Sequence, residues 1–228
     1  MVTILQIETA TAVCSAAVSV NGETVALKEL AAQNIHAASL TLFIDEVMRT
    51  SGVSYAALDA VAVSKGPGSY TGLRIGVSTA KGICFAADKP LIATDTLRMM
   101  ANGFLKEYPG YKGLICPMID ARRMEVFTGL YNPQLAEMLP VTAKVIDDKS
   151  YADELSRYHI TFIGDGAMKC SESIISSNAS FSPLNFNSAT HISSLAFRAY
   201  NEGRFEDLAY FEPYYLKDFV ITEPKKKA

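Results

Sequence analysis

The alternation of apolar and polar positions predicts a regular series of strands and helices in the first part of the chain. The expected elements are strands over 4–7, 15–20 and 24–30, a helix over 37–49, a strand over 58–63 and a helix over 70–85. Asn21-Gly22 separates the second and third strands, and this dipeptide is a strong hairpin signal. Ser51-Gly52 ends the first helix, and Lys89-Pro90 ends the second. The order β-β-β-α-β-α places the chain in the α/β class.

The second part of the chain begins again with a strongly apolar strand. The expected elements are strands over 114–119, 125–131 and 141–146, a short helix over 151–158, a strand over 161–163 and a helix over 191–203. No long linker and no short repeat divides the chain. The pattern suits a second α/β lobe, although only the first lobe is regular enough to be assigned from the pattern alone.

Residues 64–85, SKGPGSYTGLRIGVSTAKGICF, combine several glycines with the apolar spacing of a helix. A glycine loop between a strand and a helix is a common anion site. This one lacks the Lys-Ser/Thr of a Walker loop and the G-x-G-x-x-G spacing of a dinucleotide loop. Gly72, Gly76 and Ala80 instead form a ridge of small residues on one helix face.

Glycine inside a helix costs about 1 kcal/mol relative to alanine, so close packing must offset the cost of this ridge. The ridge fits against the chain's own sheet or against another subunit. The two interpretations are not exclusive, because a helix has two faces. We favour close packing over phosphate binding.

Composition and charge exclude several classes of protein. Hydrophobic residues make up 49% of the chain and charged residues 20%, which excludes a disordered chain. The net charge of −3 argues against a protein that grips nucleic acid alone, and the basic run 225–227 is expected to be a solvated tail. The cysteines show no C-x-x-C spacing, and neither a signal peptide nor a membrane-spanning run is visible. These features predict a cytoplasmic protein without membrane contact.

The residues offer no catalytic or metal-binding constellation. The three histidines, His36, His159 and His191, are too far apart in sequence for a local metal site. No G-x-S-x-G motif presents a serine nucleophile. We therefore expect no catalytic residue and no metal.

Two polar turns remain as candidate sites. Glu8-Thr9-Ala10-Thr11 follows the first strand, where a carboxylate and hydroxyls suit a nucleotide phosphate or a hydrated metal. In Asp120-Ala121-Arg122-Arg123, the adjacent arginines suit an anion, or Asp120 pairs with an arginine and holds the turn. We favour the structural interpretation for both turns, because structural ion pairs are common. The roles of Asp120, Arg122 and Arg123 stay open.

Four segments occur in an order that resembles a known family. They are GPGSYTGLRIGVSTAKG (66–82), PMIDARRMEVF (117–127), GDGA (164–167) and PYYLK (213–217), together with ILQIETAT near the start. They resemble the TsaB (YeaZ) family, a subunit of the bacterial machinery that makes threonylcarbamoyladenosine in tRNA. The likeness covers essentially the whole chain, and the first two segments carry most of its specificity.

The resemblance implies a two-lobed α/β fold of the actin-like ATPase and Hsp70 type. A ribonuclease H-like lobe over 1–100 would carry the dimerisation helices, and a smaller α/β lobe with the C-terminal tail would span 101–228. It also implies a non-catalytic subunit that binds a TsaD-type transferase and is joined by a TsaE-type ATPase. In this scheme tRNA is reached only through the complex, and a homodimer is the alternative pairing.

In the family, TsaB pairs with TsaD, or with a second copy of itself, through the two helices of the first lobe. The partner-interface residues that this implies are Leu40, Phe43, Val47, Gly72, Leu73, Gly76, Val77, Ala80 and Ile83. The residues expected at a weak nucleotide site are Glu8, Thr9, Thr11 and Gly166. ATP or ADP at the interface of the complex is the one cofactor that suits this scheme.

Two departures from the relatives support a non-catalytic role. In TsaD-like relatives, metal-binding histidines follow the second helix, whereas residues 90–101, PLIATDTLRMMA, contain no histidine. The first loop has Glu8 and Ala10 where the family more often has Asp and Ser, which weakens the case for nucleotide binding. The alternative function is a stand-alone ATPase or kinase of the actin-like class that uses Glu8 and Thr11.

Overall fold

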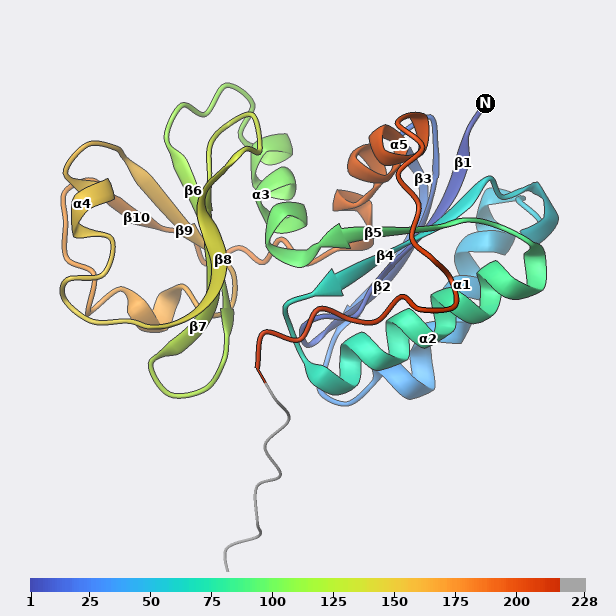
Figure 1. The fold of residues 1–228 in the computed structure, drawn as a ribbon, viewed down its shortest axis with the longest axis horizontal. Coiled ribbons are helices and arrows are strands. Elements are labelled where there is room, and N and C mark those ends of the chain that lie inside the picture. The colour runs from blue at the N-terminus through green and yellow to red at the C-terminus, as the bar shows by residue number, and fades with distance from the viewer. Residues whose placement is uncertain (218–228) are drawn as a thin grey trace, which may run out of the picture.

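The computed structural model describes residues 1–217 and is built on two five-stranded sheets, one in each lobe (Figure 1). The strands of the first sheet are β1 (Thr3–Glu8), β2 (Val13–Val20), β3 (Glu23–Ala31), β4 (Ala60–Gly66) and β5 (Leu91–Asp95). Those of the second are β6 (Leu114–Asp120), β7 (Glu125–Tyr131), β8 (Glu137–Val145), β9 (Ile160–Ile163) and β10 (Ala179–Phe181).

The two sheets repeat one topology. Their strand orders are β3-β2-β1-β4-β5 and β8-β7-β6-β9-β10. In each sheet the first three strands along the chain pair antiparallel, and the two later strands are added in parallel. The chain therefore consists of two related α/β lobes, the two-lobed arrangement that the sequence predicted.

Helices cover both faces of the first sheet. The helices are α1 (His36–Ser51), α2 (Tyr70–Ala87), α3 (Thr96–Glu107), α4 (Ala152–Leu155) and α5 (Ser193–Asn201), and the 3₁₀ turns are Tyr55–Ala57, Met168–Cys170 and Ala189–His191. Helices α1 and α2 lie side by side on one face (Figure 1). Helices α3 and α5 pack on the other face, and α3 also contacts β6 and β7 of the second sheet. Helix α3 thus joins the two lobes.

Coverage on both faces explains why β1 and β4 are buried along almost their whole length. Successive side chains of a strand point to opposite faces. Ile4 therefore packs in the core that contains α3 and α5, and Leu5 packs in the core that contains α1 and α2. Ala62 and Val63 of β4 divide in the same way.

The apolar pattern located most elements to within a few residues but missed β5, α3 and the three-residue strand β10. Strand β5 has only five residues, and its last residue, Asp95, is also the N-cap of α3. No turn residues separate the two elements, so the segment lacks the signals that mark an element's end.

The last helix belongs to the first sheet. Helix α5 follows the second sheet in the sequence, yet it contacts β1, β3 and β5. The division of the chain at residue 100 stays a prediction. The expected solvated tail at 225–227 lies outside the described residues.

Candidate functional site between the lobes

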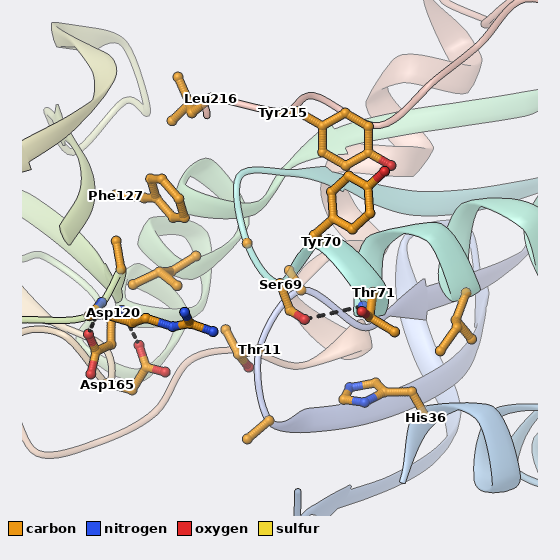
Figure 2. Close-up of a pocket in the computed structure, with 18 of the residues that line it drawn as sticks. Thr11, His36, Ser69, Tyr70, Thr71, Asp120, Phe127, Asp165, Tyr215 and Leu216 are labelled. Atoms are coloured by element: carbon orange, nitrogen blue, oxygen red, sulfur yellow. Dashed lines mark hydrogen bonds between the residues drawn. The ribbon is translucent and has the colours of Figure 1, made fainter. Parts of the chain in front are cut away.

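A cavity of about 700 Å³ lies between the two lobes. Its lining comes from the loop after β1, the N-terminal turn of α2, the turn after β6 and the C-terminal segment 214–217. Figure 2 shows Tyr70 and Tyr215 facing each other on one side of the cavity, and Asp120 and Asp165 together on the other. The cavity is therefore built by residues far apart in sequence.

Of the four residues expected at a nucleotide site, only Thr11 lines this cavity. Glu8 is fully buried, and its Oε1 accepts a hydrogen bond of 2.6 Å from the Ala10 N–H. Burial raises the pKa of Glu8 to about 7, although hydrogen bonds from Ser64 and Ala10 oppose this shift. Glu8 thus holds the first loop from inside the fold and is not presented to a ligand in the cavity.

The loop after β1 lies against the glycine ridge of α2. A Cβ atom at Gly72 would lie 2.1 Å from the Thr9 carbonyl oxygen, and one at Gly76 would lie 2.2 Å from Thr9 Oγ1. Real Cβ atoms do not approach other atoms so closely, so only glycine fits at either position. Gly72 and Gly76 of the ridge therefore pack against the chain's own first loop. Ala80 packs in the core between α2 and the chain's own sheet.

The N-terminus of α2 is closed by its own cap. Ser69 Oγ accepts a hydrogen bond of 3.2 Å from the Gly72 N–H, as an N-cap residue does. This contact satisfies one of the donors that a phosphate loop would offer. The preference for close packing over phosphate binding at this loop stays a prediction.

Lys169 holds the turn after β6. Its Nζ donates to Asp120 Oδ1 at 2.5 Å and to the carbonyl oxygens of Arg123 and Glu125 at 2.7 and 2.8 Å. The expectation that Asp120 pairs with an arginine side chain is wrong, because Lys169 takes that place from 49 residues away. The Asp120 carboxylate also accepts the Arg122 N–H at 2.7 Å. Asp120 therefore stabilises the turn, as the structural interpretation expects, but its cationic partner is Lys169.

Asp120 of this turn and Asp165 of the loop after β9 have opposite pKa shifts. Partial burial acts to raise the pKa of Asp120, but the hydrogen bonds from Lys169 and Arg122 outweigh it and lower the pKa. Burial raises the pKa of Asp165, and the nearby Asp120 charge adds to this effect. Asp165 nevertheless accepts the Asp120 N–H at 3.0 Å, which ties the loop after β9 to the turn after β6.

The C-terminal segment runs from the first lobe toward the second, as the red coil in Figure 1 shows. The Tyr214 N–H donates to the Lys65 carbonyl at 2.7 Å, and the rings of Tyr215 and Tyr70 lie 4.7 Å apart. Lys217 then forms an ion pair with Glu125 of the second lobe. Sequence reasoning found this segment only as the motif PYYLK, since nothing in it indicated a contact with either lobe.

Most of the predicted interface residues point inward. Those buried within the single chain are Leu40, Phe43, Val47, Gly72, Leu73, Gly76, Val77 and Ala80, whereas Ile83 is partly exposed. The outer faces of α1 and α2 present other residues, among them Leu42 and Phe85, which are 66% and 83% exposed. An interface role for the predicted set stays a prediction.

Part of the nucleotide site that the sequence predicted does not face the cavity between the lobes. The cavity is large enough for a nucleotide, but Glu8 is turned away from it and the N-terminus of α2 is capped. Within residues 1–217 no three His, Cys, Asp or Glu side chains gather to hold a metal ion. The same residues include no helix that is long and apolar enough to cross a membrane.

The family model and the curated relatives that this chain matches both concern threonylcarbamoyladenosine in tRNA. The family model "tRNA N6-adenosine threonylcarbamoyltransferase" (TsaD) matches residues 29–226. The tRNA threonylcarbamoyladenosine biosynthesis protein TsaB of Haemophilus influenzae is 37% identical over 125 residues, which are 55% of this chain and 52% of that protein. The chain thus spans about half the length of the curated relatives it matches.

Two solved structures resemble the fold of this chain over most of its length. YeaZ from Pseudomonas aeruginosa is 27% identical, with a TM-score of 0.79 over 95% of this chain and all of the other. An activator of 2-hydroxyisocaproyl-CoA dehydratase from Clostridium difficile, at 9% identity, has a TM-score of 0.51 over 89% of this chain and 96% of its own, and shares the fold alone. The chain thus shares a two-lobed fold with both of these proteins. The family model matches most of the chain, so the chain belongs to the TsaD family, and within that family it groups with the proteins named TsaB (YeaZ).

Proposed function

We propose that this chain is a non-catalytic subunit in the synthesis of threonylcarbamoyladenosine on tRNA, and that it binds a TsaD-type transferase through the outer faces of α1 and α2. The relatives named TsaB support the pathway. The match to the TsaD family model supports a partner of that family, since related chains often pair through equivalent elements.

The observation that carries the proposal is the outer face of α2 around Gly82. A Cβ atom at Gly82 would meet nothing within 4 Å, so the single chain gains nothing from a glycine that costs about 1 kcal/mol in a helix. Phe85, one turn farther along, is 83% exposed. Gly82 leaves open space on the helix surface, and the exposed ring of Phe85 lies close to it in the sequence. This combination suits the close approach of another helix.

The neighbouring helix extends this surface. Leu42 on the outer face of α1 is 66% exposed, and α1 packs directly against α2. Together Leu42, Gly82 and Phe85 define the docking face that we propose. The same face suits a second copy of this chain, so a homodimer competes with the transferase for it.

The burial of Glu8 away from the cavity between the lobes supports a non-catalytic role. ATP or ADP would then bind where the partner completes the site, and a TsaE-type ATPase would join the complex. The net charge of −3 supports contact with tRNA only through the complex. Because tRNA is the object of the modification, we expect the chain in the cytoplasm. The competing function, a stand-alone ATPase or kinase, would require nucleotide turnover by the isolated chain.

Size-exclusion chromatography with the transferase subunit tests the docking face. Leu42→Asp and Phe85→Asp should prevent co-elution while leaving the melting temperature unchanged, because both side chains are exposed. Ile175→Asp is the matched control, since Ile175 is 87% exposed on the second lobe. Co-elution of both α-helix variants at wild-type yield would reject the proposed face, and ATP hydrolysis by the isolated chain would favour the competing function.

A further inference from the structure

A second, smaller cavity lies beside the first turn of α3 and the last turns of α5. Its volume is about 40 Å³, and it shares no lining residue with the cavity between the lobes. The lining residues are Ala93, Thr94, Asp95, Arg98, Leu195, Arg198, Ala199 and Arg204. Both helices pack against β5, so the walls of this cavity stand on regular elements of the first lobe.

Three arginines from three segments line this small space. Arg98 lies on α3, Arg198 on α5 and Arg204 just after α5. Asp95 is the single carboxylate of the lining, and its Oδ1 lies 3.3 Å from Lys65 Nζ. Since Lys65 already balances Asp95, the lining carries an excess of positive charge.

Neighbouring acids cancel only part of this excess. Arg204 Nε pairs with Glu202 at 2.6 Å, whereas Arg98 and Arg198 form no ion pair within residues 1–217. Three guanidinium groups held around one cavity repel one another, and the repulsion is relieved when an anion lies between them.

Among the three arginines, Arg98 gives the most specific indication of an anion site. Its Nε is buried and has no hydrogen-bond partner in the described chain. A buried donor without a partner costs free energy, because it has lost its water and gained nothing in return. The Asp95 side chain, at the N-cap of α3, makes no capping hydrogen bond, so the positive end of the helix dipole adds to the field of the arginines.

We propose that this cavity binds a phosphate group through Arg98, Arg198 and Arg204. The planar guanidinium group suits the bidentate recognition of phosphate. Ala93, Leu195 and Ala199 close the cavity with apolar surface, which strengthens the charge-assisted hydrogen bonds inside it. At about 40 Å³ the cavity accepts one small oxyanion and is too small for a nucleoside. The group is either free inorganic phosphate or one phosphate of an RNA backbone.

Two titrations of the purified chain test the site and distinguish these sources. Inorganic phosphate is titrated by calorimetry, and unmodified tRNA is titrated by fluorescence anisotropy. Arg98→Met and Arg198→Gln should each weaken binding about tenfold or more, as expected for the loss of a charge-assisted hydrogen bond. Arg157→Gln, an exposed arginine on the second lobe, is the matched control and should bind like the wild type.

Binding of inorganic phosphate that both cavity variants weaken supports a site for the free anion. Binding of tRNA alone, weakened by the same two variants, supports a site for a phosphate of the RNA backbone. Arg198 is exposed, so its variant remains informative even where Arg98→Met lowers the thermal stability. The proposal is overturned when neither phosphate nor tRNA binds, or when Arg157→Gln weakens binding as much as the cavity variants do.

Discussion

Thr9 and Gly76 are in such close contact that a Cβ atom at Gly76 would lie 2.2 Å from Thr9 Oγ1. The contact joins the loop after β1 to the middle of α2. It explains why a helix tolerates glycine at this position: the close approach of the loop offsets the intrinsic cost of glycine.

Gly76→Ala should therefore destabilise the chain, although alanine is the better helix former. Overpacking of a filled site typically costs about 1–3 kcal/mol, which exceeds the gain of about 1 kcal/mol from helix propensity. Chemical denaturation measures the change in the free energy of unfolding. Gly82→Ala is the matched control on the same helix and should stabilise by about 1 kcal/mol, since its Cβ meets nothing. Equal stabilisation by both substitutions would contradict the packing described for Gly76.

Glu8 should make the stability of the chain depend on pH. Its folded pKa of about 7 lies above the ordinary value of 4.5. Between these pH values the folded chain keeps a proton that the unfolded chain has released, so the free energy of unfolding falls as pH rises. The loss is about 1.4 kcal/mol per pH unit and amounts to about 3 kcal/mol by pH 8.

Glu8→Gln should remove this dependence, because the amide stays neutral at every pH. Denaturation curves at pH 5 and pH 8 measure the effect in both chains. The variant should lose less stability than the wild type between the two values, and Glu137→Gln, an exposed control on β8, should behave like the wild type. A wild-type slope in Glu8→Gln would show that another group is responsible.

Lys169→Met should loosen the turn after β6. The substitution removes three hydrogen bonds from Nζ, one of them to a carboxylate, and leaves the side chain of Asp120 without its cation. Because Asp120 keeps about half of its surface in water, we expect a modest loss of about 1–2 kcal/mol. Thermal melting measures the loss, and Lys149→Met provides an exposed lysine for comparison. Identical melting of the two variants would show that the turn is held by other contacts.

Tyr215→Ala should release the C-terminal segment from α2. The Tyr70–Tyr215 pair contributes about 0.5–1.5 kcal/mol beyond the area that it buries. Without it, the amide of Tyr214, which donates to Lys65, should exchange its hydrogen several-fold faster. Hydrogen–deuterium exchange measures this rate. Tyr210→Ala is the control, since Tyr210 is 84% exposed, and unchanged protection of Tyr214 in Tyr215→Ala would contradict a role for the ring contact.

The sequence determined the elements whose signals are local. Asn21-Gly22 determined the hairpin of β2 and β3, and the spacing of Leu40, Ile44 and Val47 determined α1. Turn chemistry and helical period act over only a few residues. The cost of the glycines in α2 likewise indicated that this helix is closely packed. The likeness of the motifs to the TsaB family gave the fold.

Only the tertiary structure decided what these residues contact. The ridge of Gly72 and Gly76 meets Thr9, and Asp120 meets Lys169, because the sheet brings the ends of distant strands together. Glu8 is read from the sequence as a polar turn residue, but burial makes it an internal support. The guanidinium groups of Arg98 and Arg204 gather only when α5 returns to the first sheet. Such contacts depend on packing between segments far apart in the chain, which no local pattern records.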